Sequence, residues 1–424
     1  MIRMHTADPD FAQAFERLVE SRRDGDADVS RDVAAILNRV RSEGDAAIAA
    51  LTVQFDGHDQ PWRIARDDCA AAYRAIDGDL RAALDLAAAR IRAYHARQRP
   101  IDTEWTDDTG VTMGARWSAV EAAGLYVPGG RAAYPSSVLM NAIPARVAGV
   151  DRLVMVTPTP GGEANIAVLA AAHLAGIDEV WRIGGAQAIA ALAFGTVTIA
   201  PVDVIVGPGN AWVAEAKRQL YGRVGIDMVA GPSEILVVAD AHNDPEWIAA
   251  DLLSQAEHDP TSQSILLTDD GVFADAVIAA VDRLIPTLAT AAVARASWDA
   301  HGAVIVLAAF HEAPALIDRL APEHLALAVA DPQALFARVR HAGSVFLGRH
   351  TPEAIGDYLG GPNHVLPTGR RARFSSGLGV TDFMKRTSFL SATPTALAQL
   401  GPAGMTLANA EGLPAHAASI AARL

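Results

Sequence analysis

The sequence predicts an α/β fold with two doubly wound, incomplete Rossmann-like domains built on parallel sheets, a helical N-terminal region and a helical C-terminal tail. Two blocks, residues 152–221 and 234–347, alternate short apolar segments with amphipathic ones. Such alternation is typical of parallel strands connected by helices that cover the sheet. With 424 residues and a hydrophobic fraction of 51%, the chain is long enough to build more than one core.

Residues 1–115 are expected to form a mostly helical region that packs on the first α/β domain. Apolar residues recur at helical spacing from residue 11, and one long helix is expected from 67 to about 97, before Pro100. Residues 105–117 have the pattern of a hairpin or edge strand. Cys69, near the start of the long helix, is expected to be a small buried residue, because no His or Lys adjoins it to lower its pKa.

The first Rossmann-like domain is expected at 116–230, with strands at 153–156, 179–183 and 202–206, each followed by a helix. Glycine-rich turns at 184–187 and 207–210, and a Gly/Pro loop at 124–131, come near strand ends. Ligands of such sheets bind at the carboxyl ends of the strands, so these turns indicate a binding site. Neither turn has the dinucleotide fingerprint, and ordinary tight turns are the alternative.

The second Rossmann-like domain is expected at 231–375 and the helical tail at 376–424. Gln255 and His258 end the helix at 245–256, and their spacing of three places both on one face. A carboxamide oxygen and an imidazole are plausible ligands of a divalent metal, but two ligands do not hold one. Further ligands must then come from distant parts of the chain.

Three other polar clusters stand in apolar surroundings. Glu323 and His324 open a strand, and this pair of residue types suits proton transfer near neutral pH. Asp357 and His364 flank a glycine-rich loop, while Glu411 and His416 lie near the C-terminus; Ser233 adds a hydroxyl at a strand start. Each cluster also has the ordinary interpretation of a solvated loop or turn. Spacing alone does not decide which histidines and carboxylates share a site.

Composition restricts the classes of function. The net charge of −14 disfavours binding to nucleic-acid phosphates, and no segment of about 18 uncharged apolar residues predicts a membrane span. The first ten residues lack an apolar signal region. The single cysteine excludes an internal disulfide, so a cytoplasmic, reducing compartment is expected.

Taken together, the motifs resemble the histidinol dehydrogenase family over roughly the last two thirds of the chain. The segments that carry the resemblance are, in order, Gly207-Pro208-Gly209-Asn210 with Glu215-Ala216-Lys217, Ala230-Gly231-Pro232-Ser233-Glu234, Ser254-Gln255-Ala256-Glu257-His258, Glu323-His324, Gly356-Asp357-Tyr358, Asn363-His364-Val365-Leu366-Pro367-Thr368, Asp382-Phe383-Met384-Lys385-Arg386 and Glu411-Gly412-Leu413-Pro414-Ala415-His416. Asp259, where glycine is more usual, and Gly361-Pro362 depart from the pattern at positions without a family role.

The resemblance implies oxidation of L-histidinol to L-histidine in two steps through a bound aldehyde, with two NAD and one zinc per site, in a homodimer. By matched motif, Gln255, His258, Asp357 and His416 would be the zinc ligands, with His416 reaching the partner's site. Ser233, His324 and Glu411 would contact the substrate together with the ligand residues, and Tyr126, Gln187 and Asn210 would contact NAD. His324 would remove the alcohol proton and Glu323 would activate the water. Cys69 lies outside every motif, so no cysteine nucleophile is expected.

Three other functions are compatible with parts of this pattern. A zinc hydrolase would use Glu323 as a base and need no nucleotide. A paralogue of the same family would keep zinc and NAD but oxidise a different amino- or sulfo-alcohol. An inactive family member would serve as a binding scaffold; the complete set of suitable residues makes this the least favoured.

Overall fold

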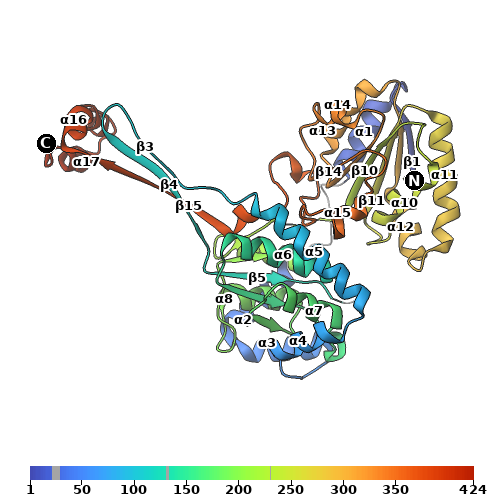
Figure 1. Cartoon of the computed structure of the whole chain (residues 1–424), viewed down its shortest axis with the longest axis horizontal. Helices are drawn as coiled ribbons and strands as arrows, with labels where there is room; N and C mark the ends of the chain where they lie inside the picture. The colour runs from blue at the N-terminus through green and yellow to red at the C-terminus, as the bar shows by residue number, and fades with distance from the viewer. Residues whose placement is uncertain (22–28, 130–132, 230) are drawn as a thin grey trace.

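The computed structural model has two α/β lobes and a long arm that projects from them (Figure 1). The structure describes residues 1–21, 29–129, 133–229 and 231–424. Residues 130–132 of the glycine-rich loop and Ala230 of the second resemblance motif therefore lie outside the described residues.

The first lobe contains a six-stranded sheet in the order β2-β7-β6-β5-β8-β9. All neighbouring strands are parallel except β2, which pairs antiparallel with β7. The strands are β2 (Arg63–Ile64), β5 (Ala122–Tyr126), β6 (Arg152–Val156), β7 (Glu179–Trp181), β8 (Val204–Val206) and β9 (Gly225–Ile226). The chain runs from β5 outward to β6 and β7, then returns to place β8 on the other side of β5. The strand order therefore reverses between β5 and β8, and such a reversal is the usual place for a ligand.

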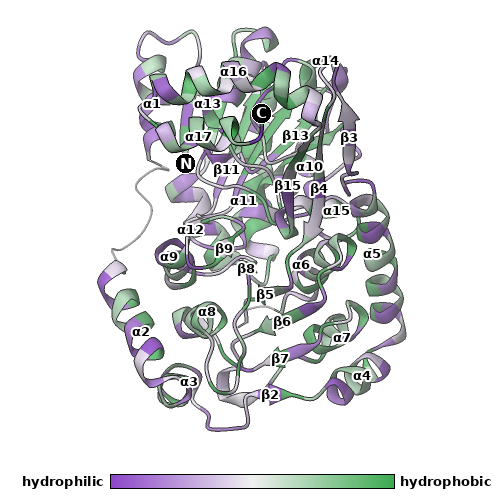
Figure 2. Cartoon of the chain, turned by 90° about the vertical axis from the view of Figure 1, so that its left-hand side faces the viewer, coloured by the Kyte–Doolittle hydropathy of each residue, from purple (hydrophilic) through white to green (hydrophobic). Residues whose placement is uncertain are grey.

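Helices cover both faces of this sheet, and each face has its own hydrophobic core. The helices of this lobe are α2 (Ser30–Glu43), α3 (Asp45–Asp56), α4 (Arg66–Ala75), α5 (Gly78–Ala96), α6 (Pro135–Ala148), α7 (Ile166–Leu174), α8 (Gly185–Phe194) and α9 (Ala211–Leu220). The many alanines let these helices lie close to the strands, and Figure 2 shows the hydrophobic residues gathered on the strands and on the inner helix faces.

The second lobe contains a fully parallel six-stranded sheet in the order β1-β12-β11-β10-β13-β14. Its strands are β1 (Ile2–His5), β10 (Glu234–Ala239), β11 (Gln263–Thr268), β12 (Ala303–Val306), β13 (His324–Ala328) and β14 (Ser344–Leu347). Its helices are α1 (Phe11–Glu20), α10 (Pro245–Ala256), α11 (Gly271–Leu284), α12 (Ala291–His301), α13 (Ala313–Leu320), α14 (Pro332–Phe336) and α15 (Glu353–Tyr358). Central strands β10, β11 and β13 are buried throughout, as expected for a parallel sheet covered on both faces.

The arm is a three-stranded antiparallel sheet that carries two helices at its end (Figure 1). Its strands are β3 (Thr103–Thr106), β4 (Val111–Ala119) and β15 (Met384–Ala392), and its helices are α16 (Pro394–Ala410) and α17 (Pro414–Ala421). Strand β15 pairs with β4 over its whole length, so a segment near the C-terminus lies beside one from the first third of the chain.

The structure confirms the two parallel-sheet domains and differs from the expectations in three places. The long helix expected at 67–97 is two helices, because Asp77 accepts a hydrogen bond from the backbone N–H of Asp79 and starts α5 as its N-cap. The tail is not helical throughout, because Met384–Ala392 finds a strand partner in β4. Strand β1 pairs with β12, so the first residues belong to the second sheet, not to the first lobe.

Within the part of the chain that the structure describes, none of the helices combines the length and apolar character that crossing a lipid bilayer requires.

Candidate active site and metal centre

The polar residues of the candidate site come together at the amino ends of the second sheet. His324 is the first residue of β13, and its register places it beside Ile235 of β10. Gln255 lies in the last turn of α10, and Asp357 lies in α15. Helix α10, strand β13 and helix α15, which are far apart in the sequence, thus each place a side chain in the candidate site.

Hydrogen bonds fix the two residues expected to move protons. His324 Nδ1 donates to the carbonyl oxygen of Glu234, 3.0 Å away. Because a carbonyl only accepts, this bond requires the proton on Nδ1 and leaves the lone pair on Nε2. Glu323 is also buried, and one of its oxygens accepts a hydrogen bond of 2.9 Å from the backbone N–H of Glu234. Both side chains are therefore anchored to the start of β10.

The unprotonated nitrogen of His324 faces two carboxylates. Nε2 lies 3.7 Å from an oxygen of Glu353 and 3.9 Å from an oxygen of Asp357. One ligand atom from each of the three residues can be chosen so that all lie within 4.8 Å of one another. His364 completes this side of the site, because its Nδ1 donates to the backbone oxygen of Asp357 and its Nε2 lies 3.3 Å from the hydroxyl of Ser137.

Burial and like charge raise the pKa values of two carboxyl groups here, Asp357 and Glu323. Burial, with added repulsion from Glu353, raises the pKa of Asp357 to about 8. Burial first, and then the neighbouring carboxylates, raise the pKa of Glu323 well above its usual value. Burial lowers the pKa of His324, and it lowers the pKa of His364 to about 4. A divalent cation among these groups would favour ionised carboxylates and neutral imidazoles, the forms that bind metal.

Several buried polar atoms around this cluster have no hydrogen-bond partner among the described residues. They are Gln255 Oε1, His324 Nε2 and Glu353 Oε1. An unpartnered buried polar atom is costly, and a ligand or ion is one explanation for it. Gln255 Nε2 lies 3.2 Å from His258 Nδ1, so the two side chains expected to bind zinc are adjacent. Nitrogen and oxygen donors without thiolates suit a catalytic zinc, so the residues fit this ion.

The structure does not bring every expected residue to this place within one chain. It brings together Gln255, His258, Asp357, Glu323 and His324, with Ser233 directly before β10. Glu411 and His416 are exposed at the junction of α16 and α17, at the far end of the arm, well away from α10 and α15 (Figure 1).

The three residues expected to contact NAD lie at the carboxyl edge of the first sheet. The buried hydroxyl of Tyr126, at the end of β5, accepts a 3.1 Å hydrogen bond from the backbone N–H of Gly185 at the start of α8, and burial raises its pKa to about 12. Gln187 is buried in the first turn of α8. Asn210 is the N-cap of α9, where its side chain accepts hydrogen bonds from Trp212 and Val213. Two helix N-termini therefore lie at the carboxyl edge of one sheet, which favours an anionic ligand such as a dinucleotide.

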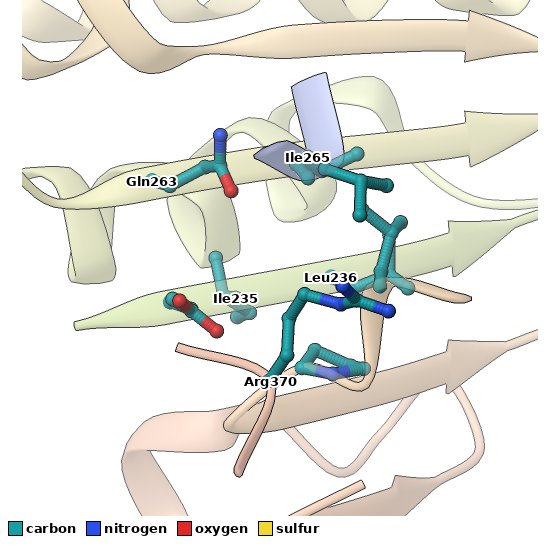
Figure 3. A pocket seen from close by; sticks show the side chains of 9 residues that line it. Ile235, Leu236, Gln263, Ile265 and Arg370 are labelled. Carbon is teal, nitrogen blue, oxygen red and sulfur yellow. The ribbon is translucent and has the colours of Figure 1, made fainter. Parts of the chain in front are cut away.

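A small cavity lies beside Glu234 of the polar cluster, between the second sheet and the segment that carries Arg370 (Figure 3). Its volume is about 10 Å³, enough for at most one water. Arg370 is held there by a hydrogen bond of 2.8 Å from its Nε to the backbone oxygen of Arg319. The cavity is therefore a packing feature and not a substrate pocket.

Sequence reasoning missed Glu353, the most buried acid of the cluster. Its side chain accepts a hydrogen bond of 3.1 Å from the hydroxyl of Ser254. Glu353 and Asp357 are four residues apart on α15, so both face the same side of that helix. That spacing was visible in the sequence, but six residues between Pro352 and the glycine loop do not by themselves predict a helix.

The fold and site together define a two-lobed α/β enzyme with a strand-order reversal of the nucleotide-binding type in one sheet and a metal-type cluster on the other. Comparison with known proteins identifies the family. The histidinol dehydrogenase family model matches residues 19–424, and the chain belongs to the histidinol dehydrogenase family.

Individual relatives agree over the full length. The chain is 64% identical to the histidinol dehydrogenase of Zymomonas mobilis, covering 100% of this chain and 99% of the relative. It is 60% identical to that of Rhodospirillum rubrum, with 100% and 98% covered. The crystal structure of the Elizabethkingia anophelis histidinol dehydrogenase superposes with a TM-score of 0.95 at 35% identity, covering 100% of this chain and 98% of that one. An acetylating aldehyde dehydrogenase from Geobacillus thermoglucosidasius, at 14% identity and a TM-score of 0.51 over 91% and 98% of the two chains, shares the fold alone.

Proposed function

We propose that the chain oxidises L-histidinol to L-histidine through bound L-histidinaldehyde, the last steps of histidine biosynthesis. As a member of its family it is an oxidoreductase that uses NAD and zinc. The residue assignment depends on one observation: Gln255 of α10, His324 of β13 and Asp357 of α15 converge on one place. Glu323, the buried residue that precedes His324, lies beside them. We further assign NAD binding to the domain at 116–230, and zinc binding and proton transfer to the domain at 231–375. We also propose that the protein is cytoplasmic.

We assign Gln255, His258, Asp357 and a histidine from a partner subunit as the residues that hold zinc. When bound, zinc supplies a Lewis-acidic centre that orients the nitrogens of the substrate, and NAD supplies the hydride acceptor. The raised pKa of Asp357 favours this assignment, because a nearby cation offsets the repulsion from Glu353.

His324 is the base of the first step. Its Nδ1 proton is committed to the Glu234 carbonyl, so Nε2 is the atom available to take the proton of the substrate alcohol. Burial lowers the pKa of His324 and keeps it neutral before the reaction. The two carboxylates that face Nε2 then stabilise the imidazolium that forms.

Glu323 is the base of the second step. It takes a proton from the water that adds to the aldehyde carbon, and the hydrate formed in this way is the species oxidised to the carboxylic acid. The raised pKa of Glu323 makes its ionised form a strong base for this transfer. Ser233, beside β10, and Glu411, from a partner, are assigned as substrate contacts.

We propose a homodimer in which the arm of each subunit reaches the site of the other. Within one chain, His416 and Glu411 lie at the tip of the arm, away from the residues they are expected to join (Figure 1). The tip also exposes large apolar side chains, among them Leu400, Leu407 and Leu413, that a partner would cover.

The number of NADH molecules formed per histidinol tests this function. The purified zinc-loaded protein is mixed with limiting L-histidinol and excess NAD, and NADH is measured by its absorbance. Two NADH per histidinol, with histidine as product, are expected. One NADH per histidinol with release of the aldehyde would contradict the four-electron reaction. Turnover of a different amino- or sulfo-alcohol in preference to histidinol would favour a paralogue, and hydrolysis without NADH would favour a zinc hydrolase.

A further inference from the structure

The peptide groups of Gly207 are held from both sides by one buried ion pair. The N–H of Gly207 donates to Asp227 Oδ2 at 2.8 Å, and the carbonyl oxygen of Gly207 accepts from Lys217 Nζ at 3.0 Å. Lys217 and Asp227 form an ion pair with each other, and their side chains are only 2% and 1% exposed. Both polar backbone atoms of a single glycine are thus satisfied by two opposite charges.

Gly207 occupies the point where the first sheet reverses its strand order. It follows β8, and a Cβ at this position would lie 2.1 Å from the backbone oxygen of Tyr126, at the end of β5. Its φ of +111° is one that other residues rarely adopt. The backbone here is therefore closely confined between two strand ends that border the proposed cofactor site.

The two charged residues come from the two segments that follow the turn. Lys217 lies in α9, the helix that Asn210 caps, so its bond to Gly207 joins that helix back to its own entry turn. Asp227 directly follows β9, on the connection that leads to Ser233 and β10. Through Asp227, the turn at 207–210 is tied to the segment that continues into the catalytic lobe.

Stability alone does not explain such a pair. Removing two charges from water costs as much as their attraction returns, so a buried ion pair contributes little net stability. The pair instead fixes orientation, because the Asp227 carboxylate accepts a hydrogen bond and the Lys217 ammonium donates one, each from a defined position. At Gly207 the two charges specify the orientation of both flanking peptide groups.

We propose that Lys217 and Asp227 are positioning residues that fix the turn at 207–210 for NAD binding, an inference that rests on the assignment of NAD to this site. The pair touches neither cofactor nor reacting atoms. It sets the place of Asn210 and of the backbone between Gly207 and Asn210, and through them the affinity for the dinucleotide.

The test measures NADH binding without substrate, by the change in NADH fluorescence, alongside steady-state kinetics and urea unfolding. Lys217→Met and Asp227→Leu are each expected to raise the Kd of NADH and the KM of NAD by roughly tenfold or more, because a small misplacement of a binding turn is costly. The KM of histidinol is expected to stay within about twofold, because the histidinol site lies on the other lobe. Asp227→Asn keeps an acceptor for the N–H of Gly207 and is expected to bind NADH better than Asp227→Leu.

Arg152→Met is the matched control. Arg152 pairs with Glu179 at 2.7 Å, at the opposite, amino-terminal edge of the same sheet. This variant also loses an ion pair of the NAD lobe, but its Kd for NADH is expected to equal that of the wild type.

The outcomes separate this inference from the function on which it rests. A normal Kd for NADH in folded Lys217→Met and Asp227→Leu would overturn the positioning role while leaving the dehydrogenase function in place. An equal rise in the Kd for NADH of the Arg152→Met control would also overturn the positioning role, because the loss of affinity would then come from general destabilisation of the first lobe. Failure of the wild-type protein to bind NADH or reduce NAD would instead remove the proposed function.

Discussion

At the scale of single residues, the chemistry depends on which proton each side chain holds. His324 is oriented by one carbonyl, and Glu323 by one backbone N–H, both from Glu234. A single residue at the start of β10 therefore orients both proposed bases. The two roles can be separated experimentally because the proposal assigns a different base to each half-reaction.

Glu323→Gln is expected to slow aldehyde oxidation by about 10²-fold or more and to leave alcohol oxidation nearly unchanged, because a carboxamide does not act as a general base. Glutamine still accepts the hydrogen bond from Glu234, so the fold is preserved. Single-turnover measurements with histidinol and with histidinaldehyde report the two rates separately. Equal losses in both half-reactions would contradict the assignment of Glu323 to the water.

The zinc ligands can be distinguished from their neighbours by metal content. His258→Asn is expected to lose most of its zinc on dialysis against a chelator, because the proposal makes His258 a direct ligand. Glu353→Gln is expected to keep its zinc but to lower kcat, because Glu353 faces His324 Nε2 and is assigned no metal bond. Asp357→Asn serves as the comparison, since it should lose zinc under either ligand set. Zinc retained in His258→Asn and lost in Glu353→Gln would place the metal among His324, Glu353 and Asp357.

Cys69 tests the absence of a thiol nucleophile. It is buried, and burial first, then Asp68, raise its pKa from 9.0 to about 11. The folded protein thus holds the thiol proton more tightly than the unfolded chain, so this contribution to stability is complete below pH 9 and is lost as the pH rises from 9 towards 11. Cys69→Ala is expected to keep full kcat.

Urea unfolding of wild type and Cys69→Ala between pH 8 and 10.5 checks the titration. The wild type should lose roughly 2 kcal/mol more than the variant over this interval. Loss of activity in a folded Cys69→Ala protein would contradict a mechanism without cysteine.

At the scale of elements, the break between α4 and α5 shows how a local signal decides a boundary. Asp77 caps α5 and Ile76 is extended, so the chain turns between the two helices. The spacing of apolar residues continues across this turn and therefore does not reveal it. Asp77→Ala is expected to cost about 1 kcal/mol, the usual value of a lost N-cap. Urea unfolding measures the loss, and kcat should be unchanged because α5 lies outside the site. An unchanged midpoint would contradict the capping role.

The helices and strands also show how much of the fold could be predicted from the sequence. Hydrophobic alternation located β5 to β8 and β10 to β14, since a buried parallel strand needs a short apolar run and little else, but it did not locate the edge strands β1, β2 and β9. It did not locate β15, because Lys385, Arg386 and Thr387 form a strand only through pairing with β4, more than 250 residues earlier. Glu353 was missed for a related reason, since its role appears only once α15 is packed beside α10.

At the scale of the whole molecule, the arm separates the C-terminal end of the polypeptide from the candidate site of the same chain, whereas the N-terminal strand β1 belongs to the second sheet. β3, β4 and β15 extend away from both lobes, and α17 lies at their tip (Figure 1). A three-stranded sheet with a strand of nine residues is a stiff support, so the tip does not fold back onto its own lobes without breaking the β4–β15 ladder. The ligand set that we propose, which includes His416, would therefore need a second subunit.

Mixed dimers test whether the site is shared. In a swapped dimer, a subunit with His258→Asn still lends an intact His416, and a subunit with His416→Asn still offers an intact cluster around His258. Each variant alone should be inactive. Co-expressed in equal amounts, they should form hybrids in half of all dimers, each with one complete site, so that roughly a quarter of wild-type activity returns. If each arm served its own chain, no combination would contain a complete site, and the mixture would stay as inactive as its components.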